Sequence, residues 1–278
     1  TIKHDVNFEG IGLHSGETVH MTLSPAPVNT GIIFRRTDLK HIPQLKLCVE
    51  GMTEAIMCSK LVSGDESIST IEHLVSAICA FEIDNLYIDI DAPEVPVFDG
   101  SSQVFVQALE SMSVIPQTQP RSYIRILKPI SVKHDDKWVK LLPNNSNDNN
   151  LHFKITIDFS HPVIAATPQS VDFTLSKRGF ITKVSNARTF GFAADLEKLH
   201  ANNLAKGASL DNAIGLSEDA VLNESGLRYE DEFVRHKLLD AIGDVYTIGP
   251  VIGLYEAHKP SHALTHRCLK ELLSKESE

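Results

Sequence analysis

The sequence contains no apolar run long enough to cross a membrane and no excess of positive charge. A membrane-spanning helix needs roughly 18 or more consecutive apolar residues, and no stretch of the 278 residues reaches that length. The formal net charge of -10 argues against a protein that coats nucleic acid, because neutralising phosphates requires basic patches. The chain starts without an initiator Met or an apolar signal core, so we expect a trimmed, cytoplasmic protein.

Cysteine is scarce, and the common zinc-protease motif is missing. The four cysteines are Cys48, Cys58, Cys79 and Cys268, and they form no CxxC pair. A chain of this length needs no disulfide to fold, so we expect reduced thiols. No HExxH sequence is present. Apolar residues, in contrast, make up 42% of the chain, enough for the core of one large domain or two ordinary ones.

A polar, proline-containing segment at 113–122 divides the chain, and we interpret it as a domain linker. Before it, apolar patterns predict strands over 19–24, 31–35 and 85–90 and helices over 68–81 and 104–112. After it, they predict strands over 123–127, 138–142, 151–159 and 251–255 and helices over 230–247 and from about 264. The asparagine-rich tract 144–150 is expected at an exposed hairpin tip. Each half ends in a helix followed by a strand, which hints at two related halves.

Two interpretations are open for residues 69–74, which read STIEHL. Ser69 followed by Glu72 matches a capping box, in which the glutamate reaches back to the N–H of the cap residue. In that case His73 is an ordinary structural residue. Alternatively, His73 points away from the apolar stripe of its helix and is available for chemistry.

A second polar group lies in the helix predicted over 230–247. His236 and Asp240 are four residues apart, so both side chains can reach one ion from the same face. Lys237 and Asp244 fall on the same side, roughly opposite the apolar residues. An ordinary solvated face has the same pattern, although a surface helix does not usually place a residue such as Gly243 in its interior.

Two further segments place reactive side chains at element ends. Ser261 and His262 join the last predicted strand to the last helix, where Ser261 fits a helix cap and His262 a catalytic position on a loop. Residues 186–192 set Thr189 beside an arginine and two aromatics, a pattern that also fits a simple strand end with a turn.

Together these segments contain the ligands that a catalytic metal needs. Catalytic zinc keeps three protein ligands and one open position, and His73, His236 and Asp240 fit that rule. Bound zinc lowers the pKa of water from about 15.7 towards 7 and polarises a carbonyl. Ferrous iron accepts the same ligands, so the sequence does not choose between Zn²⁺ and Fe²⁺.

Hydrolysis also needs proton transfer, and candidates for it lie beside the ligands. Glu72 is adjacent to His73 and is therefore our candidate for the general base. His262 is an imidazole of suitable pKa for protonating a departing amine. Lys237 or Thr189 could help to hold the oxyanion.

Seven stretches of the sequence resemble one enzyme family, and they run in order through nearly the whole chain. They are GIGLHSG (10–16), PAPVNTG (25–31), ISTIEHL (68–74), APEVP (92–96), DGS (99–101), ARTFGF (187–192) and FVRHKLLDAIGD (233–244). The chain resembles the UDP-3-O-acyl-N-acetylglucosamine deacetylases of Gram-negative lipid A synthesis. These are zinc-dependent hydrolases that release acetate from an acylated UDP-sugar.

The resemblance implies catalytic roles for residues at matching positions. His73, His236 and Asp240 match the zinc ligands. Glu72 matches the general base and His262 the general acid. Asp244 matches the carboxylate that orients the acid, and Lys237 and Thr189 match the groups that stabilise the tetrahedral intermediate.

The resemblance also implies contacts with substrate. Phe190 and Asp195 are expected to touch the sugar-nucleotide, and Lys137, Phe159 and Lys259 are expected at the uracil and diphosphate end. Leu196, Ala208 and Ile214 are expected to line a tunnel for the acyl chain. The implied partner is an acylated UDP-sugar, with no nucleic acid, at most peripheral membrane association through the acyl chain, and a monomeric protein.

The fold implied by the resemblance is α+β, with two similar domains over 1–115 and 122–278. Each domain is a β-sheet layered on α-helices, and the active site lies between them. A small βαβ-type insert at about 192–222 belongs to the second domain and forms the tunnel.

The sequence departs from the family pattern at Lys259-Pro260-Ser261-His262, where the family usually has Lys-Ser-Gly-His. Pro260 fixes its own φ and restricts Lys259, so we expect the loop to aim Lys259 or His262 slightly differently. Residues 202–209 contain less glycine than the family usually has, which leaves the acyl length open.

Two alternatives to the deacetylase are a different zinc amidase on the same scaffold and a non-catalytic module that binds acylated sugar-nucleotides. An acyl tunnel would disfavour the first, because a short polar substrate has no use for one. The second predicts that the ligands would have decayed, whereas all three are present with Glu72 and His262.

Overall fold

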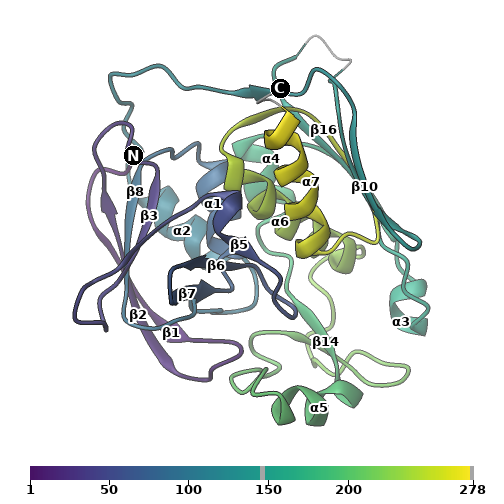
Figure 1. Cartoon of the computed structure of the whole chain (residues 1–278). Coiled ribbons are helices and arrows are strands. Elements are labelled where there is room, and N and C mark those ends of the chain that lie inside the picture. The colour runs from purple at the N-terminus through teal and green to yellow at the C-terminus, as the bar shows by residue number, and fades with distance from the viewer. Residues whose placement is uncertain (145–147, 276–278) are drawn as a thin grey trace.

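Two β-sheets stand on either side of a layer of helices in the computed structural model, which describes residues 1–144 and 148–275 (Figure 1). The arrangement is mixed α+β, as the sequence predicts. Buried apolar side chains from both sheets and from the helices between them form one continuous core. Among the described residues, none of the helices combines the length and apolar character that crossing a bilayer needs.

The first sheet has the strand order β1-β2-β8-β3-β4. Its strands are β1 (Val6–Ile11), β2 (Thr18–Pro25), β3 (Ile32–Arg36), β4 (Gln44–Lys46) and β8 (Leu86–Ile90). Only β3 and β8 pair in parallel. Alternate residues of β2, namely Val19, Met21 and Leu23, are buried, so one face of this sheet is turned to the core.

The second sheet repeats that plan with the order β10-β11-β16-β12-β13. Its strands are β10 (Ile130–His134), β11 (Lys137–Leu142), β12 (Leu151–Thr156), β13 (Ser170–Thr174) and β16 (Val251–His258), with β9 (Ile124–Arg125) paired to the start of β16. Here β12 and β16 are the parallel pair of the ordered path. Strand order and strand direction therefore match between the two sheets. The domain limits 1–115 and 122–278 stay a prediction.

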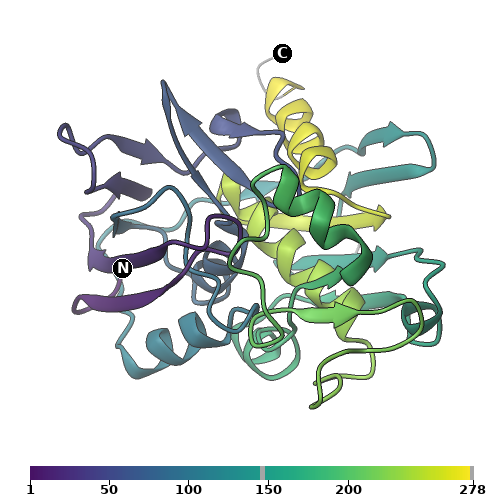
Figure 2. The ribbon, with the colours of Figure 1, turned by 90° about the horizontal axis from the view of Figure 1, so that it is seen from below.

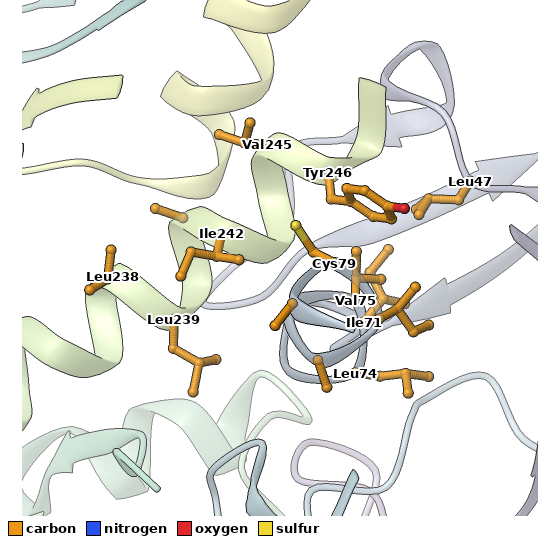
Figure 3. Packing of buried hydrophobic residues seen from close by; sticks show 14 of the residues in the cluster. Leu47, Ile71, Leu74, Val75, Cys79, Leu238, Leu239, Ile242, Val245 and Tyr246 are labelled. Carbon is orange, nitrogen blue, oxygen red and sulfur yellow. The ribbon is translucent and has the colours of Figure 1, made fainter. Parts of the chain in front are cut away.

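The central helices are α1 (Glu72–Ala80) and α6 (Glu232–Val245), each leading into the middle strand of its sheet. Every residue of α1 is buried, and Figure 3 shows α1 and α6 side by side with Cys79 of α1 pointing towards α6. The two backbones approach closely at Gly243. A Cβ at that position would lie 2.3 Å from the carbonyl oxygen of Glu72, so only glycine permits this contact.

Each half also carries a small sheet inserted ahead of its central helix. In the first half, β5 (Met52–Thr53), β6 (Lys60–Ser63) and β7 (Glu66–Ser69) form an antiparallel sheet. In the second half, β14 (Phe190–Phe192) pairs in parallel with β15 (Ile214–Leu216), and α5 (Leu196–Ala201) connects them. That β-α-β arrangement is the insert predicted at 192–222, and Figures 1 and 2 show α5 standing apart from the main sheets.

The remaining helices cover the sheets and the chain end. They are α2 (Gln103–Ser111), α3 (Pro162–Ala165), α4 (Lys177–Lys183) and α7 (His262–Lys275). Ser261 caps α7, because its Oγ accepts the Leu264 N–H at 3.3 Å.

The capping box predicted at Ser69 and Glu72 is wrong. Ser69 ends strand β7 and its hydroxyl donates to the carbonyl of Pro93. Thr70 has a left-handed backbone with φ +57, which separates the strand from α1. The helix predicted over 68–81 therefore begins only at Glu72, whose carboxylate turns to the Ser59 N–H at 3.1 Å instead of to a cap.

Two further expectations are corrected by contacts between elements that are distant in the sequence. Strands β11 and β12 do not form the expected hairpin, because β16 lies between them in the sheet; of the tract 144–150 expected at its tip, residues 145–147 lie outside the described part of the chain. The polar face of α6 is not solvated, since His236, Asp240 and Asp244 are all buried. Burying three ionisable side chains is costly unless each has a polar or charged partner. The residues that act as these partners make up the site.

Candidate metal centre and active site

Three predicted metal ligands converge where α1 meets α6. His73 Nε2 lies 3.6 Å and His236 Nε2 3.4 Å from Asp240 Oδ1. The ligand atoms of the three residues all lie within 4.8 Å of one another, and all three side chains are buried. His73 starts α1 and the other two are one turn apart on α6, so the helix contact itself brings the two His and the Asp together.

The donor set fits a divalent metal such as zinc. His236 donates its Nδ1 proton to the Ala187 carbonyl at 3.0 Å, which leaves Nε2 free as the ligand atom. Burial lowers the pKa of His236 to about 4, so the imidazole is neutral, the form that binds a metal. Within the described part of the chain, Asp240 Oδ1 is buried without a hydrogen-bond partner, whereas Lys237 Nζ holds Oδ2 at 2.8 Å. A bound cation would satisfy that orphan oxygen.

Glu72 lies directly beside this centre. Its Oε2 accepts the backbone N–H of Ser59, and its Oε1 lies 3.8 Å from His262 Nε2. Burial raises the pKa of Glu72 although His262 and His73 act against the rise. A carboxyl group with a raised pKa beside a metal centre is well suited to accept a proton.

His262, at the start of α7, is held by the carboxylate of Asp244. Its Nδ1 donates to Asp244 Oδ2 at 2.7 Å. Burial disfavours the charged imidazole, but Asp244 outweighs this effect and raises the pKa of His262 to about 9. Burial likewise disfavours ionised Asp244, yet His262 and His266 keep its pKa below the usual range. The pair thus keeps His262 protonated, as a general acid must be.

A cavity of about 290 Å³ opens over these groups. Its walls include the metal-binding side chains together with Thr189, Phe190, Phe159 and Asp195. The Thr189 backbone is fixed on two sides, because its N–H donates to Gly100 and its carbonyl accepts from Ile214. Four residues that the resemblance implied for catalysis or substrate contact therefore share one space with the metal centre.

A second, mostly apolar cavity of about 280 Å³ adjoins the first. Leu196, Ala208 and Ile214, the expected tunnel residues, all line it. The two cavities have Phe190 and Phe192 in common, so the insert of the second half lines both the chamber that contains the candidate ligands and the mostly apolar chamber beside it. This arrangement suits a molecule with a polar reacting end and an acyl tail.

Comparison with known proteins agrees with this geometry. A family model described as UDP-3-O-acyl N-acetylglycosamine deacetylase matches residues 1–274. The chain belongs to this family. A relative from Francisella tularensis subsp. tularensis (strain SCHU S4 / Schu 4) is 48% identical over 272 residues, or 97% of this chain and 94% of the relative. One from Legionella pneumophila (strain Corby) is 48% identical over 276 residues, or 98% and 89%. Both are named UDP-3-O-acyl-N-acetylglucosamine deacetylase.

Two lysines expected at the diphosphate end of a family substrate are not among the residues that line the cavity. Lys137 is exposed at the start of β11. Lys259 pairs with Asp136 at 2.5 Å and Asp158 at 2.8 Å. Its backbone is left-handed, with φ +50, immediately before Pro260. The departure from the family loop pattern thus coincides with an unusual backbone, while His262 keeps its contact with Asp244.

Sequence reasoning missed three supporting residues of this family member. Glu232 is fully buried and accepts from Arg188 Nε at 2.9 Å and from its N–H at 3.0 Å, which anchors the segment that presents Ala187 and Thr189. His266 lies 3.3 Å from Asp244 Oδ1. Ser59 contacts both Asp244 and Glu72. His266 is one helical turn from His262, and this spacing in the sequence could have predicted that both lie near Asp244. No comparable pattern in the sequence points to Ser59.

Proposed function

We propose that this protein is a zinc-dependent amidase that removes the acetyl group of UDP-3-O-acyl-N-acetylglucosamine, the committed step of lipid A biosynthesis. The observation that carries the proposal is the convergence of two histidine Nε2 atoms and one unpartnered carboxylate oxygen beside Glu72 and His262. That set of groups opens onto one cavity that adjoins a second, mostly apolar one. Membership of a deacetylase family supports the choice of an N-acetyl sugar over other amides.

His73, His236 and Asp240 would hold the metal. When bound, zinc supplies a Lewis acid that acidifies water and polarises the acetamide carbonyl, and ferrous iron remains compatible with the same ligands. Lys237 keeps Asp240 oriented through its bond to Oδ2 at 2.8 Å. Its ammonium group is also close enough to the centre to favour negative charge on the substrate oxygen, a role in which Thr189, which lines the same cavity, assists.

Proton transfer is assigned to Glu72 and His262. Glu72 takes a proton from the attacking water at Oε1, because Oε2 is held by the Ser59 N–H. His262 gives a proton from Nε2 to the departing amine, because Nδ1 is held by Asp244. The two reacting atoms are 3.8 Å apart, so one substrate group fits against both. The products are acetate and the free amino sugar.

The substrate would extend from this centre in two directions. The acyl chain enters the apolar cavity along Leu196, Ala208 and Ile214. The sugar-nucleotide contacts Phe190, Asp195 and Phe159 in the cavity over the candidate ligands. Lys137 and Lys259 then serve the diphosphate end, which requires Lys259 to exchange its carboxylate partners for phosphate.

The proposed setting is the cytoplasm, with a monomeric protein and membrane contact only through the acyl substrate. A short polar amide is disfavoured as substrate, because it would leave the apolar cavity unused.

Metal dependence provides the test. Purified protein is analysed for bound metal, stripped with a chelator, and assayed for acetate release from the acylated UDP-sugar before and after zinc is restored. The proposal predicts about one metal per chain, loss of activity on stripping and recovery with zinc. Asp240→Asn should bind less metal and remain inactive after zinc is added. Full activity in the stripped protein would refute the proposed mechanism.

A further inference from the structure

Ser59 lies between the two groups to which we assign proton transfer. It is 1% exposed and comes directly before β6. Its Oγ donates to Asp244 Oδ1 at 2.5 Å and lies 3.1 Å from His262 Nδ1. Its backbone N–H donates to Glu72 Oε2 at 3.1 Å. Ser59 therefore contacts the proposed base, Glu72, directly. It contacts the proposed acid, His262, both directly and through the carboxylate of Asp244.

The two oxygens of Asp244 have different partners, and this fixes the carboxylate plane. Oδ2 accepts from His262 Nδ1 at 2.7 Å, and Oδ1 accepts from Ser59. With both oxygens engaged, Asp244 has one orientation, and the imidazole that it holds has one orientation too. Nδ1 of His262 is then the donor to Asp244, which leaves Nε2 directed towards Glu72.

His266 shows what the hydroxyl prevents. Its Nε2 lies 3.3 Å from Asp244 Oδ1, yet both ring nitrogens of His266 are buried without a hydrogen bond among the described residues. If the Ser59 hydroxyl were removed, Oδ1 would lose its donor, and His266 would be the nearest replacement. The carboxylate would shift towards His266 Nε2, which is already within 3.3 Å of Oδ1, because a buried oxygen without a partner is costly.

Ser59 also connects parts of the chain that are far apart. It lies directly before strand β6 of the small sheet of the first half, whereas Asp244 is on α6 and His262 starts α7. The contact spans 185 positions to Asp244 and 203 to His262. Glu72, on α1, is held by the same residue, so the spacing of acid and base depends on a side chain and a peptide group of Ser59.

We propose that Ser59 is a positioning residue for the acid–base pair: its hydroxyl locks the Asp244 carboxylate so that His262 presents Nε2 to the departing amine. The inference rests on the proposed function, because it assigns a purpose to the orientation of His262. Ser59 itself gives no proton to the substrate and holds no metal.

Kinetics of Ser59→Ala give the first test. On the acylated UDP-sugar, the zinc-loaded variant should lose about 10- to 100-fold in kcat, the usual effect of removing a supporting partner. KM should stay within about twofold, since no substrate contact is lost. Ser185→Ala is the matched control, because Ser185 is also fully buried and its hydroxyl bonds to Gln103 and Ile181 instead. An unchanged kcat in Ser59→Ala, with zinc content equal to wild type, would overturn the proposal.

A double-mutant cycle separates positioning from general damage. If Ser59 acts through His262, adding Ser59→Ala to His262→Ala should reduce kcat by less than about threefold, because residues that act as a unit are not additive. A loss in the double variant as large as in Ser59→Ala alone would show that Ser59 acts elsewhere.

A spectroscopic readout makes the inference independent of turnover. In zinc-loaded, ¹⁵N-histidine-labelled protein, the Nδ1 proton signal of His262 is identified by its absence in His262→Ala. It should shift or broaden in Ser59→Ala and stay unchanged in Ser185→Ala. If wild type releases no acetate but the signal responds, the proposed function fails and the positioning role stands. If wild type is active and neither the signal nor kcat responds, the positioning role fails alone.

Discussion

The two halves of the molecule share a framework and differ in what they insert into it. Strand order and direction are the same in the sheets β1-β2-β8-β3-β4 and β10-β11-β16-β12-β13, and each central helix leads into the middle strand of its sheet. The insert of the first half is an antiparallel sheet that supplies Ser59 next to Asp244 and Glu72. The insert of the second half is a β-α-β unit that supplies Thr189, Phe190 and an apolar cavity.

The proposed active site must both hold a metal and surround the substrate, and different parts of the molecule provide for these two tasks. The shared framework supplies the groups proposed to bind the metal, since His73 lies on α1 and His236 and Asp240 on α6. The inserts supply what surrounds them, with polar positioning groups on one side and an apolar chamber on the other. Changes in the framework should therefore affect chemistry and stability together, whereas changes in the second insert should affect the choice of substrate.

The largest effect is expected for Glu72, on the framework. Glu72→Gln keeps the shape of the side chain but cannot accept a proton, so kcat should fall by roughly 10²- to 10⁴-fold. Acetate release measures the loss, and metal analysis should show unchanged zinc. Glu66→Gln on strand β7 of the first insert is the matched control. Near-normal turnover by a zinc-loaded Glu72→Gln would mean that the base is another group.

A smaller effect is expected where the two central helices touch. Gly243→Ala places a Cβ 2.3 Å from the Glu72 carbonyl, so α1 and α6 must separate. The free energy of unfolding, measured in urea, should fall by about 1–3 kcal/mol, the usual cost of overpacking, and kcat should fall with it. Gly191→Ala is the control, because no atom lies within 4 Å of its Cβ position. Equal stability of Gly243→Ala and wild type would show that the helices have room to spare.

The smallest effect is expected in the second insert. Ala208→Leu narrows the apolar cavity and should exclude about two methylene groups of a long acyl chain, each worth about 0.8 kcal/mol. The resulting loss in kcat/KM is roughly tenfold for a long-chain substrate and negligible for a short-chain one. Ala201→Leu, exposed at the end of α5, is the control. A loss that is equal for both chain lengths would argue that the cavity does not hold the acyl group.

Local patterns in the sequence predicted the elements better than their pairing. Spacing of four residues placed His236 and Asp240 on one face of α6, and the structure has them there. The solvated-face interpretation failed because burial of that face depends on α1 and α7, which are distant in sequence. The capping-box interpretation failed for a related reason: Ser69 is used by strand β7, and the left-handed turn at Thr70 gives no composition signal.

The remainder of the site depends on contacts that no single segment encodes. His73 reaches the ligands of α6 only because Gly243 allows the helices to touch. Ser59 stands in a stretch without any recognisable motif and reaches Asp244 across 185 positions. Expectations for Phe190 and the tunnel came from family resemblance, and the segment that contains Thr189 fitted a strand end equally well. Pairing between distant strands and helices therefore limits what one sequence reveals about this site.

The most direct test compares acetate release by the wild-type, zinc-loaded protein from two substrates: the acylated UDP-sugar and the same UDP-sugar without its acyl chain. A metal centre that opens onto an apolar cavity predicts rapid release from the acylated substrate and a kcat/KM lower by at least about 100-fold for the other, since several buried methylene groups are lost. Equal turnover of the two substrates would contradict the account, and so would release of acetate from neither.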